Sequence, residues 1–116
     1  MKKIFIIVVS LFFIGCSSDN SYKTISTKQT FNEITKTIIL DVRSEEEYNN
    51  GHIESSINLP LDNIEDINYK KDTKIIVYCQ SGNRSKQAAL KLIDMGYTNV
   101  YDMGGITNWP YDIVEE

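Results

Sequence analysis

The sequence is poor in the residues that build disulfide-rich and metal-binding proteins. Its 116 residues include two cysteines and one histidine. A disulfide framework needs more cysteines than this, and structural zinc sites use four Cys or His ligands. We therefore expect no disulfide-stapled fold and no metal site. A chain of this length allows one compact domain.

The sequence also lacks an excess of basic residues. Sixteen Asp and Glu outnumber twelve Lys and Arg, which gives a net charge of −4. Binding to nucleic acid needs a clustered basic face that neutralises phosphates, so we expect no nucleic-acid partner. The chain after residue 16 shows no internal repeat and no low-complexity segment, which favours a globular domain over a repeat array.

The one long apolar run is too short to span a membrane. Ile4–Ile14 is apolar at every position except Ser10, whereas a spanning helix needs roughly 20 apolar residues. The run follows Lys2 and Lys3 and precedes a small residue, a pattern typical of a secretory signal. An ordinary cleaved signal or a hydrophobic first helix is the alternative interpretation.

The end of this run, Phe13-Ile14-Gly15-Cys16, resembles the lipobox of bacterial lipoproteins, in which the cysteine is lipidated and becomes the new N-terminus. Phe13 departs from the leucine usual at that position. The resemblance implies a signal peptide over residues 1–15, a polar tether over residues 16–23 that starts at the lipidated Cys16, and a folded domain over residues 24–116. It also implies an exported protein, lipid-anchored to a bacterial membrane in the periplasm or at the cell surface.

The second cysteine, Cys79, is then left without a partner. Lipidation of Cys16 removes the possibility of a disulfide between the two. A free thiol in an oxidising compartment is a liability unless the thiol is used. The cysteine count therefore indicates a functional role for Cys79.

Strand and helix patterns alternate along the chain. Short β-branched or apolar runs predict strands at residues 38–42, 74–78 and 99–103. Capping and amphipathic patterns predict helices at residues 26–36, 44–50 and 85–95, with short helical turns at residues 61–67 and near Asn108. This alternation favours an α/β domain with a largely parallel central sheet flanked by helices. Sites in such sheets form where a strand ends and the next helix begins, which is the position of Cys79.

The segment Cys79-Gln80-Ser81-Gly82-Asn83-Arg84 joins a buried strand to the most regular predicted helix. Gly82 lets the backbone curl so that successive N–H groups turn inward as an anion nest. The helix adds unpaired N–H donors and the positive end of its dipole, and Arg84 adds a charge. These features favour the thiolate form of Cys79, the nucleophilic form. An isolated cysteine after an apolar strand would otherwise be a core residue.

Four segments resemble the rhodanese family, in the family's order and over roughly residues 24–112. They are Leu40-Asp41-Val42-Arg43, Gly51-His52-Ile53 with Asn58-Leu59-Pro60, the loop from Cys79 to Ser85, and Gly104-Gly105-Ile106-Thr107-Asn108-Trp109. Ser55-Ser56 departs from the Gly-Ala pair often found there. The resemblance implies a rhodanese-like three-layer sandwich.

The resemblance also implies a sulfurtransferase that works in two steps. The Cys79 thiolate would take the outer sulfur of thiosulfate or a similar small anionic donor. An acceptor such as cyanide or a thiol would then remove that sulfur from the Cys79 persulfide. The N–H groups of residues 80–84 would bind the donor and stabilise the persulfide. This chemistry requires no cofactor, and we expect a monomer.

Two basic residues near the loop have two interpretations each. Arg84 either contacts the sulfonate of the donor, which we favour, or braces the loop. Lys86 either helps to attract an anionic donor or is a solvated lysine at the start of a helix.

For the remaining motif residues we favour roles in the structure over roles in the chemistry. Arg43 could give electrostatic support to the site, but an ion pair with Asp41 or Glu47 that fixes this corner is favoured. His52 is typical of a turn, with substrate contact as the alternative. Trp109 is expected to pack in the domain rather than to line a pocket.

Two other functions fit parts of the pattern. Dual-specificity phosphatases and some arsenate reductases resemble the chain in a cysteine loop with an arginine, but their loops have five residues between the two, and this loop has four. A non-catalytic rhodanese module that only binds a partner would often lack the cysteine. A slow carrier that passes persulfide to a partner protein stays open as an alternative.

Overall fold

A computed structural model describes residues 21–116, and the predicted signal peptide and lipidated Cys16 lie outside the described residues. The elements in chain order are β1 (Lys23–Thr24), α2 (Thr27–Asn32), β2 (Ile38–Asp41), α3 (Glu45–Asn49), β3 (Ile57–Asn58), the 3₁₀ helix η1 (Leu61–Asp66), β4 (Ile75–Cys79), α4 (Asn83–Asp94), β5 (Val100–Gly105) and the 3₁₀ helix η2 (Ile106–Asn108). None of the helices in this part of the chain is long and apolar enough to cross a membrane.

The strands form one five-stranded sheet in the order β1-β5-β4-β2-β3, and every pairing is parallel. The predicted α/β class with a largely parallel sheet is therefore confirmed. The central strand β4 is buried at all five positions, which is why its sequence is apolar throughout rather than alternating.

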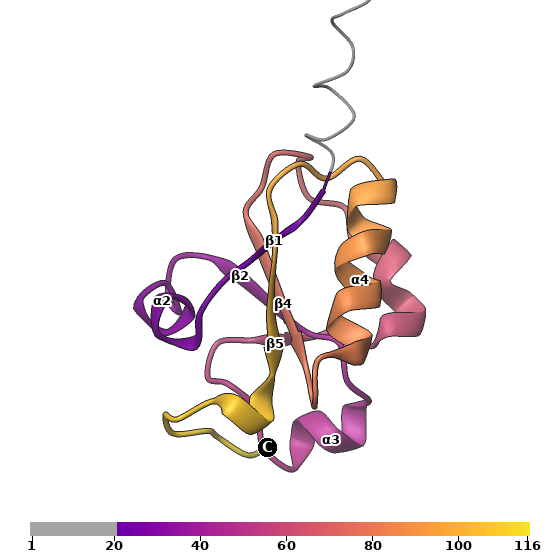
Figure 1. The fold of residues 1–116 in the computed structure, drawn as a ribbon. Helices are drawn as coiled ribbons and strands as arrows, with labels where there is room; N and C mark the ends of the chain where they lie inside the picture. The colour runs from indigo at the N-terminus through magenta and orange to yellow at the C-terminus, as the bar shows by residue number, and fades with distance from the viewer. Residues whose placement is uncertain (1–20) are drawn as a thin grey trace, which may run out of the picture.

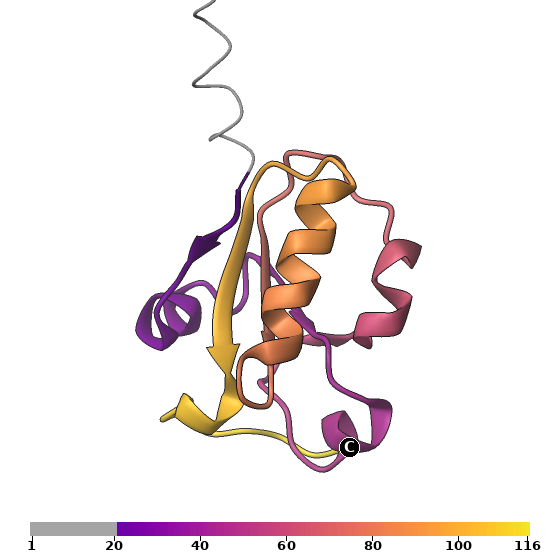
Figure 2. The same cartoon turned by 45° about the vertical axis from the view of Figure 1, so that its right-hand side comes forward.

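Helices cover both faces of the sheet, as Figures 1 and 2 show, so the domain has the predicted three layers. Successive strand residues point to opposite faces. Ile75, Val77 and Cys79 of β4 pack in the cluster that contains α4 and η1. Ile76 and Tyr78 pack in the other cluster, together with Ile34, Ile106 and Trp109. The predicted nucleophile therefore lies on the α4 face.

The helix starts follow the capping patterns in the sequence. Ser44 caps α3, and a capping box joins its side chain and backbone N–H to Glu47. Ser26 caps α2 through its side chain alone, which accepts the N–H of Gln29. The prediction that α2 runs to residue 36 is wrong, because the helix ends at Asn32 and the chain continues in tight turns, in which the N–H of Glu33 donates to the Thr30 carbonyl and the N–H of Lys36 donates to the Glu33 carbonyl.

Strands β1 and β3 were not predicted, because two residues are too few to show a strand pattern. Lys23, which it assigned to the tether, pairs with Tyr101 of β5. The preceding residue, Tyr22, packs against the core cluster on the α4 face. The ordered domain thus begins slightly earlier than residue 24.

The departure at Ser55-Ser56 has a local structural consequence at each position. Ser55 has a φ of 74°, a left-handed conformation that glycine adopts without strain. Ser56 is buried, and its hydroxyl lies 3.0 Å from the buried hydroxyl of Tyr78. The serine therefore supplies a polar partner to Tyr78 that an alanine would not.

Candidate active site

Cys79 is the last residue of β4 and is 1% exposed. The backbone N–H of Gly82 donates to its Sγ at 3.0 Å. Gly82 has a φ of 108° and forms the N-cap of α4, so the chain turns back toward the sulfur through a conformation that glycine favours. Of the predicted nest of N–H groups over residues 80–84, the Gly82 N–H is the one that the structure shows bonded to the sulfur.

The loop is supported from behind by the end of β5. Gly105 lies so close to the loop that a Cβ there would collide with the carbonyl oxygen of Gln80 and lie 2.8 Å from the Cα of Ser81. The N–H of Thr107 donates to the same Gln80 oxygen at 3.3 Å. Gly105 therefore has a packing role against the loop that was not predicted from the sequence.

Arg84 is engaged in an ion pair on the surface beside the loop. Its two Nη atoms donate to the two carboxylate oxygens of Glu47 in α3, at 2.8 and 3.0 Å. Both side chains are about one-third exposed. The structure thus shows Arg84 in the bracing arrangement, in which it joins α3 to the start of α4.

The hydrogen bonds from Arg84 are the main reason that the pKa of Glu47 is lowered to about 2. A carboxylate with a lowered pKa stabilises the folded state above its unfolded pKa, and this stabilisation is lost as the pH falls through the folded pKa. Because Glu47 is partly exposed, its contribution is discounted to about 1 kcal/mol.

We expect Glu47→Gln to reduce the loss of stability between pH 7 and pH 3. Glutamine retains the ability to cap α3 but carries no charge for Arg84. Urea unfolding at both pH values should show the wild type losing about 1 kcal/mol more than the variant on acidification. Equal losses in the two proteins would contradict the assigned role of this ion pair.

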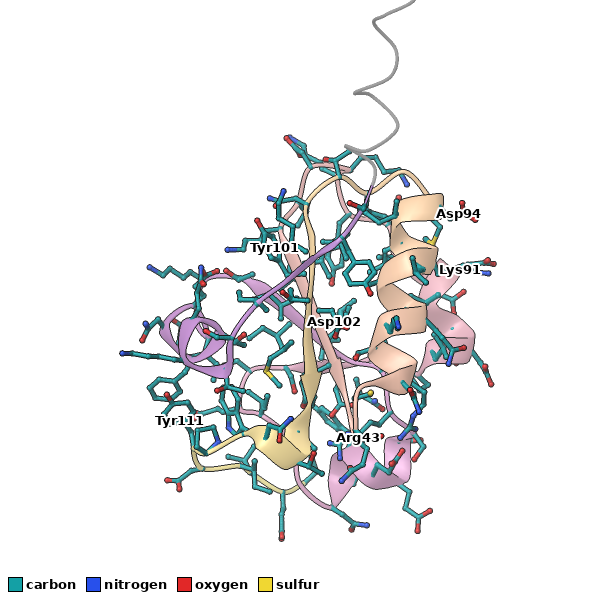
Figure 3. The ribbon with its side chains drawn as sticks, viewed as in Figure 1. Arg43, Lys91, Asp94, Tyr101, Asp102 and Tyr111 are labelled. Atoms are coloured by element: carbon teal, nitrogen blue, oxygen red, sulfur yellow. The ribbon has the colours of Figure 1, made fainter. Side chains whose placement is uncertain are left out.

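Arg43 is buried and fixes the end of β2. Its guanidinium binds the fully buried Asp41, with the shortest contact at 2.7 Å. It also donates to the carbonyl of Gly51 at 2.7 Å and to the side-chain Oε1 of Gln80 at 3.1 Å. The favoured ion pair with Asp41 is confirmed, and Arg43 supports the loop through Gln80. Figure 3 shows Arg43 at the end of β4, next to α3.

His52 holds the C-terminal segment against the domain. Its backbone N–H and carbonyl both bond to Val114 at 2.9 Å, and its Nδ1 lies 2.7 Å from the carbonyl of Tyr48. The side chain is 2% exposed and stacks on the Tyr48 ring. The interpretation of His52 as a structural residue near a turn agrees with these contacts.

A groove of about 430 Å³ opens beside the loop. One wall is polar and contains Arg43, Glu47 and Gln80, and the other contains Trp109 and Tyr111. Trp109 therefore both packs in the core, as expected, and lines a pocket, which was not expected. Tyr111 was not predicted as a pocket residue, because the segment after Trp109 has no recognisable motif.

The remaining predicted site residues lie on the surface of the loop and the helix. Ser81, Asn83 and Lys86 are exposed. Within residues 21–116 there is no group of three or more His, Cys, Asp or Glu side chains that could hold a metal ion.

Most of the described domain matches one known protein family. Residues 25–111 match the sequence profile of the family described as Rhodanese-like domain. The chain belongs to this rhodanese-like family. Its fold agrees with a solved structure of a rhodanese-related protein from Thermoplasma volcanium, with a TM-score of 0.72 and 33% identity, covering 82% of this chain and 100% of that one.

Two curated relatives of this rhodanese-like domain are named as sulfurtransferases. It is 39% identical over 72 residues to the thiosulfate sulfurtransferase PspE of Escherichia coli, covering 58% of this chain and 68% of the relative. It is 38% identical over 79 residues to the adenylyltransferase and sulfurtransferase uba4 of Ogataea parapolymorpha, covering 65% of this chain. The match spans only 20% of the length of that second relative.

Proposed function

We propose that this rhodanese-like domain transfers sulfane sulfur through a persulfide on Cys79. The observation that carries the proposal is the hydrogen bond from the Gly82 N–H to the Cys79 sulfur at 3.0 Å. A backbone donor aimed at sulfur stabilises an anion there, whether a thiolate or the terminal sulfur of a persulfide. The name of the E. coli relative supports thiosulfate as a donor.

The proposed reaction has two displacements. The Cys79 thiolate attacks the outer sulfur of thiosulfate, a new S–S bond forms, and the old S–S bond breaks with its electron pair leaving on sulfite. Cyanide or a thiolate then attacks the outer sulfur of the persulfide, and the electron pair of the broken bond returns to Cys79. The products with cyanide are thiocyanate and the original thiolate.

Two features support sulfur transfer over phosphate chemistry. The loop between Cys79 and Arg84 is one residue shorter than the phosphatase loop. The charge of Arg84 is already compensated by Glu47, whereas phosphate binding needs an arginine available to the oxygens of the anion.

The proposal is tested by intact-mass measurement of residues 17–116 after incubation with thiosulfate. We expect the wild type to gain the mass of one sulfur atom, and cyanide to remove it with release of thiocyanate. Cys79→Ser, the matched control, should gain nothing because it lacks the sulfur nucleophile. A wild type that stays unmodified while its thiol is reduced would exclude thiosulfate as the donor. A stable gain that cyanide removes only slowly would favour the persulfide carrier.

We also propose that the domain is exported and held on a bacterial membrane by a lipid on Cys16. The support is the segment Phe13-Ile14-Gly15-Cys16 after a short apolar run. In bacteria that express the full chain, Cys16→Ser should move the protein from the detergent phase to the aqueous phase of a Triton X-114 partition, because the acyl chains are lost. Thiocyanate formation in solution should be unchanged. An unmodified Cys16 in the mature wild-type protein would contradict the proposal.

A further inference from the structure

The two ends of the sheet differ in the charge of the exposed side chains around them. Because all the strands are parallel, the loops that precede β2, β4 and β5 lie at one edge, together with the start of β1. We call this the strand-start edge, formed by residues 21–23, 33–37, 67–74 and 94–99. The loop after Cys79 lies at the other end. Figures 1 and 2 show β1 starting at the strand-start edge, with α3 at the opposite end.

The strand-start edge is basic although the protein is acidic. Its five lysines are Lys23, Lys36, Lys70, Lys71 and Lys74. Its three acids are Glu33, Asp72 and Asp94. This positive balance contrasts with the net charge of −4 for the chain. Four of the five lysines are exposed, and Lys74 is partly exposed.

Most of these lysines are not neutralised by an ion pair with an acidic side chain. Among the described residues, the ion pair of Lys74 with Glu33 at 2.7 Å is the one formed by these five lysines. Two of them also lie over aromatic rings, with the Nζ of Lys71 4.2 Å from the ring centre of Tyr97. The Nζ of Lys74 lies 4.7 Å from the ring centre of Tyr101. The rings hold these lysines at the edge without neutralising them.

The opposite end of the domain carries the contrary charge. Exposed acids follow β2 in α3, and others lie in the C-terminal segment that packs against α3. They are Glu45, Glu46, Asp112, Glu115 and Glu116. An anionic surface would therefore attract the strand-start edge and repel the end that carries Cys79.

The chain itself limits how far the strand-start edge can lie from the proposed anchor. Five residue steps separate Cys16 from Ser21, and they span at most about 17 Å when fully extended. Lysines near an anionic bilayer are attracted within a Debye length of its surface, about 8 Å at physiological salt. The tether is short enough to bring the lysines into that range.

We propose that the strand-start edge docks on anionic lipid headgroups and turns the Cys79 loop away from the bilayer. The proposal rests on the lipid anchor proposed above. Reactants would then reach the groove beside the loop from the aqueous side. The lysines and the tether together would hold the domain in one orientation, which a tether alone would not.

The test supplies the anchor artificially, so that it does not depend on lipidation of Cys16. Residues 17–116 with an N-terminal hexahistidine are bound to vesicles that contain a nickel-chelating lipid in phosphatidylcholine, with or without one-third phosphatidylglycerol. All the elements that the structure describes lie within residues 21–116, and a complete homologous chain is covered by 82% of this chain. Exposed lysines are acetylated with a water-soluble reagent, and the rates are measured by peptide mass spectrometry.

We expect acetylation of Lys23, Lys70 and Lys71 to slow about fivefold on the anionic vesicles, the factor for roughly one lysine contact, and to recover in 0.5 M salt. Lys86, beside the Cys79 loop, should react equally on both kinds of vesicle. The proposal would be overturned if each of the four lysines were acetylated at the same rate on both kinds of vesicle, or if Lys86 were protected on the anionic vesicles. Sulfur transfer is not measured in this experiment, so its failure is separate from a failure of the proposed activity.

Two triple variants with the same change of charge complete the design. Lys23→Gln/Lys70→Gln/Lys71→Gln removes part of the strand-start edge, and Lys28→Gln/Lys86→Gln/Lys91→Gln removes exposed lysines elsewhere. Protection of Lys36 on anionic vesicles should be lost in the first variant and kept in the second. Loss of Lys36 protection in both variants would show that binding depends only on the net charge of the protein. That result would overturn the proposed orientation.

Discussion

Gly105→Ala should reduce thiocyanate formation by about a hundredfold, the loss expected when a reactive group is displaced by roughly 1 Å. The added methyl group would meet the backbone of Gln80 and Ser81, which cannot swing aside like the end of a flexible side chain. The loop would have to move, and the Gly82 N–H would lose its position on the Cys79 sulfur. Overpacking of this kind should also cost about 1–3 kcal/mol of stability.

Gly104→Ala is the matched control for this prediction. A Cβ at Gly104 has no atom within 4 Å, but the residue has a φ of 97°. Alanine there should cost about 1–2 kcal/mol through backbone strain while the loop stays in place. Rates of thiocyanate formation, measured on folded protein, should therefore separate the two variants. Similar rates in both would show that close packing behind the loop does not position Cys79.

Arg43→Met should destabilise the domain by about 3–5 kcal/mol, because it leaves a buried carboxylate without its partner. Asp41 is completely buried and receives its charge-assisted hydrogen bonds from Arg43. The loss is a large fraction of the stability of about 5–15 kcal/mol that is typical of a small domain. The midpoint of urea unfolding measures it directly.

The double variant Asp41→Asn/Arg43→Met tests the cause. Removal of both charges leaves no unpaired buried ion, so part of the lost stability should return. A double variant less stable than Arg43→Met would show that Arg43 acts mainly through its bonds to Gly51 and Gln80 rather than through the buried charge of Asp41.

The sequence was sufficient for those parts of the fold that have a strong local pattern. The run from Ile75 to Tyr78 is apolar at each step, and Ser44 with Glu47 forms the capping box that its spacing predicts. The end of α2 was not predictable in this way. After Asn32 the chain continues in tight turns, and Glu33 pairs with Lys74, which lies far away in the sequence.

The site was likewise predictable only where its parts are adjacent in the sequence. Cys79 and Gly82 follow from the strand, the glycine and the helix that are adjacent in the chain. The partner of Arg84 does not, because α3 and α4 meet only in the folded domain. The same holds for Gly105, whose role depends on the approach of β5 to the loop after β4.

The position of β5 in the sheet has a consequence for the order in which the domain folds. β5 pairs with β4 on one side and with β1 on the other. Lys23 at the start of the domain therefore cannot pair until Tyr101, near its end, is in place. Pairings this distant in sequence close slowly. A chain made from its N-terminus cannot complete the sheet until β5 has emerged. Its first strand is therefore among the last parts of the domain to be fixed.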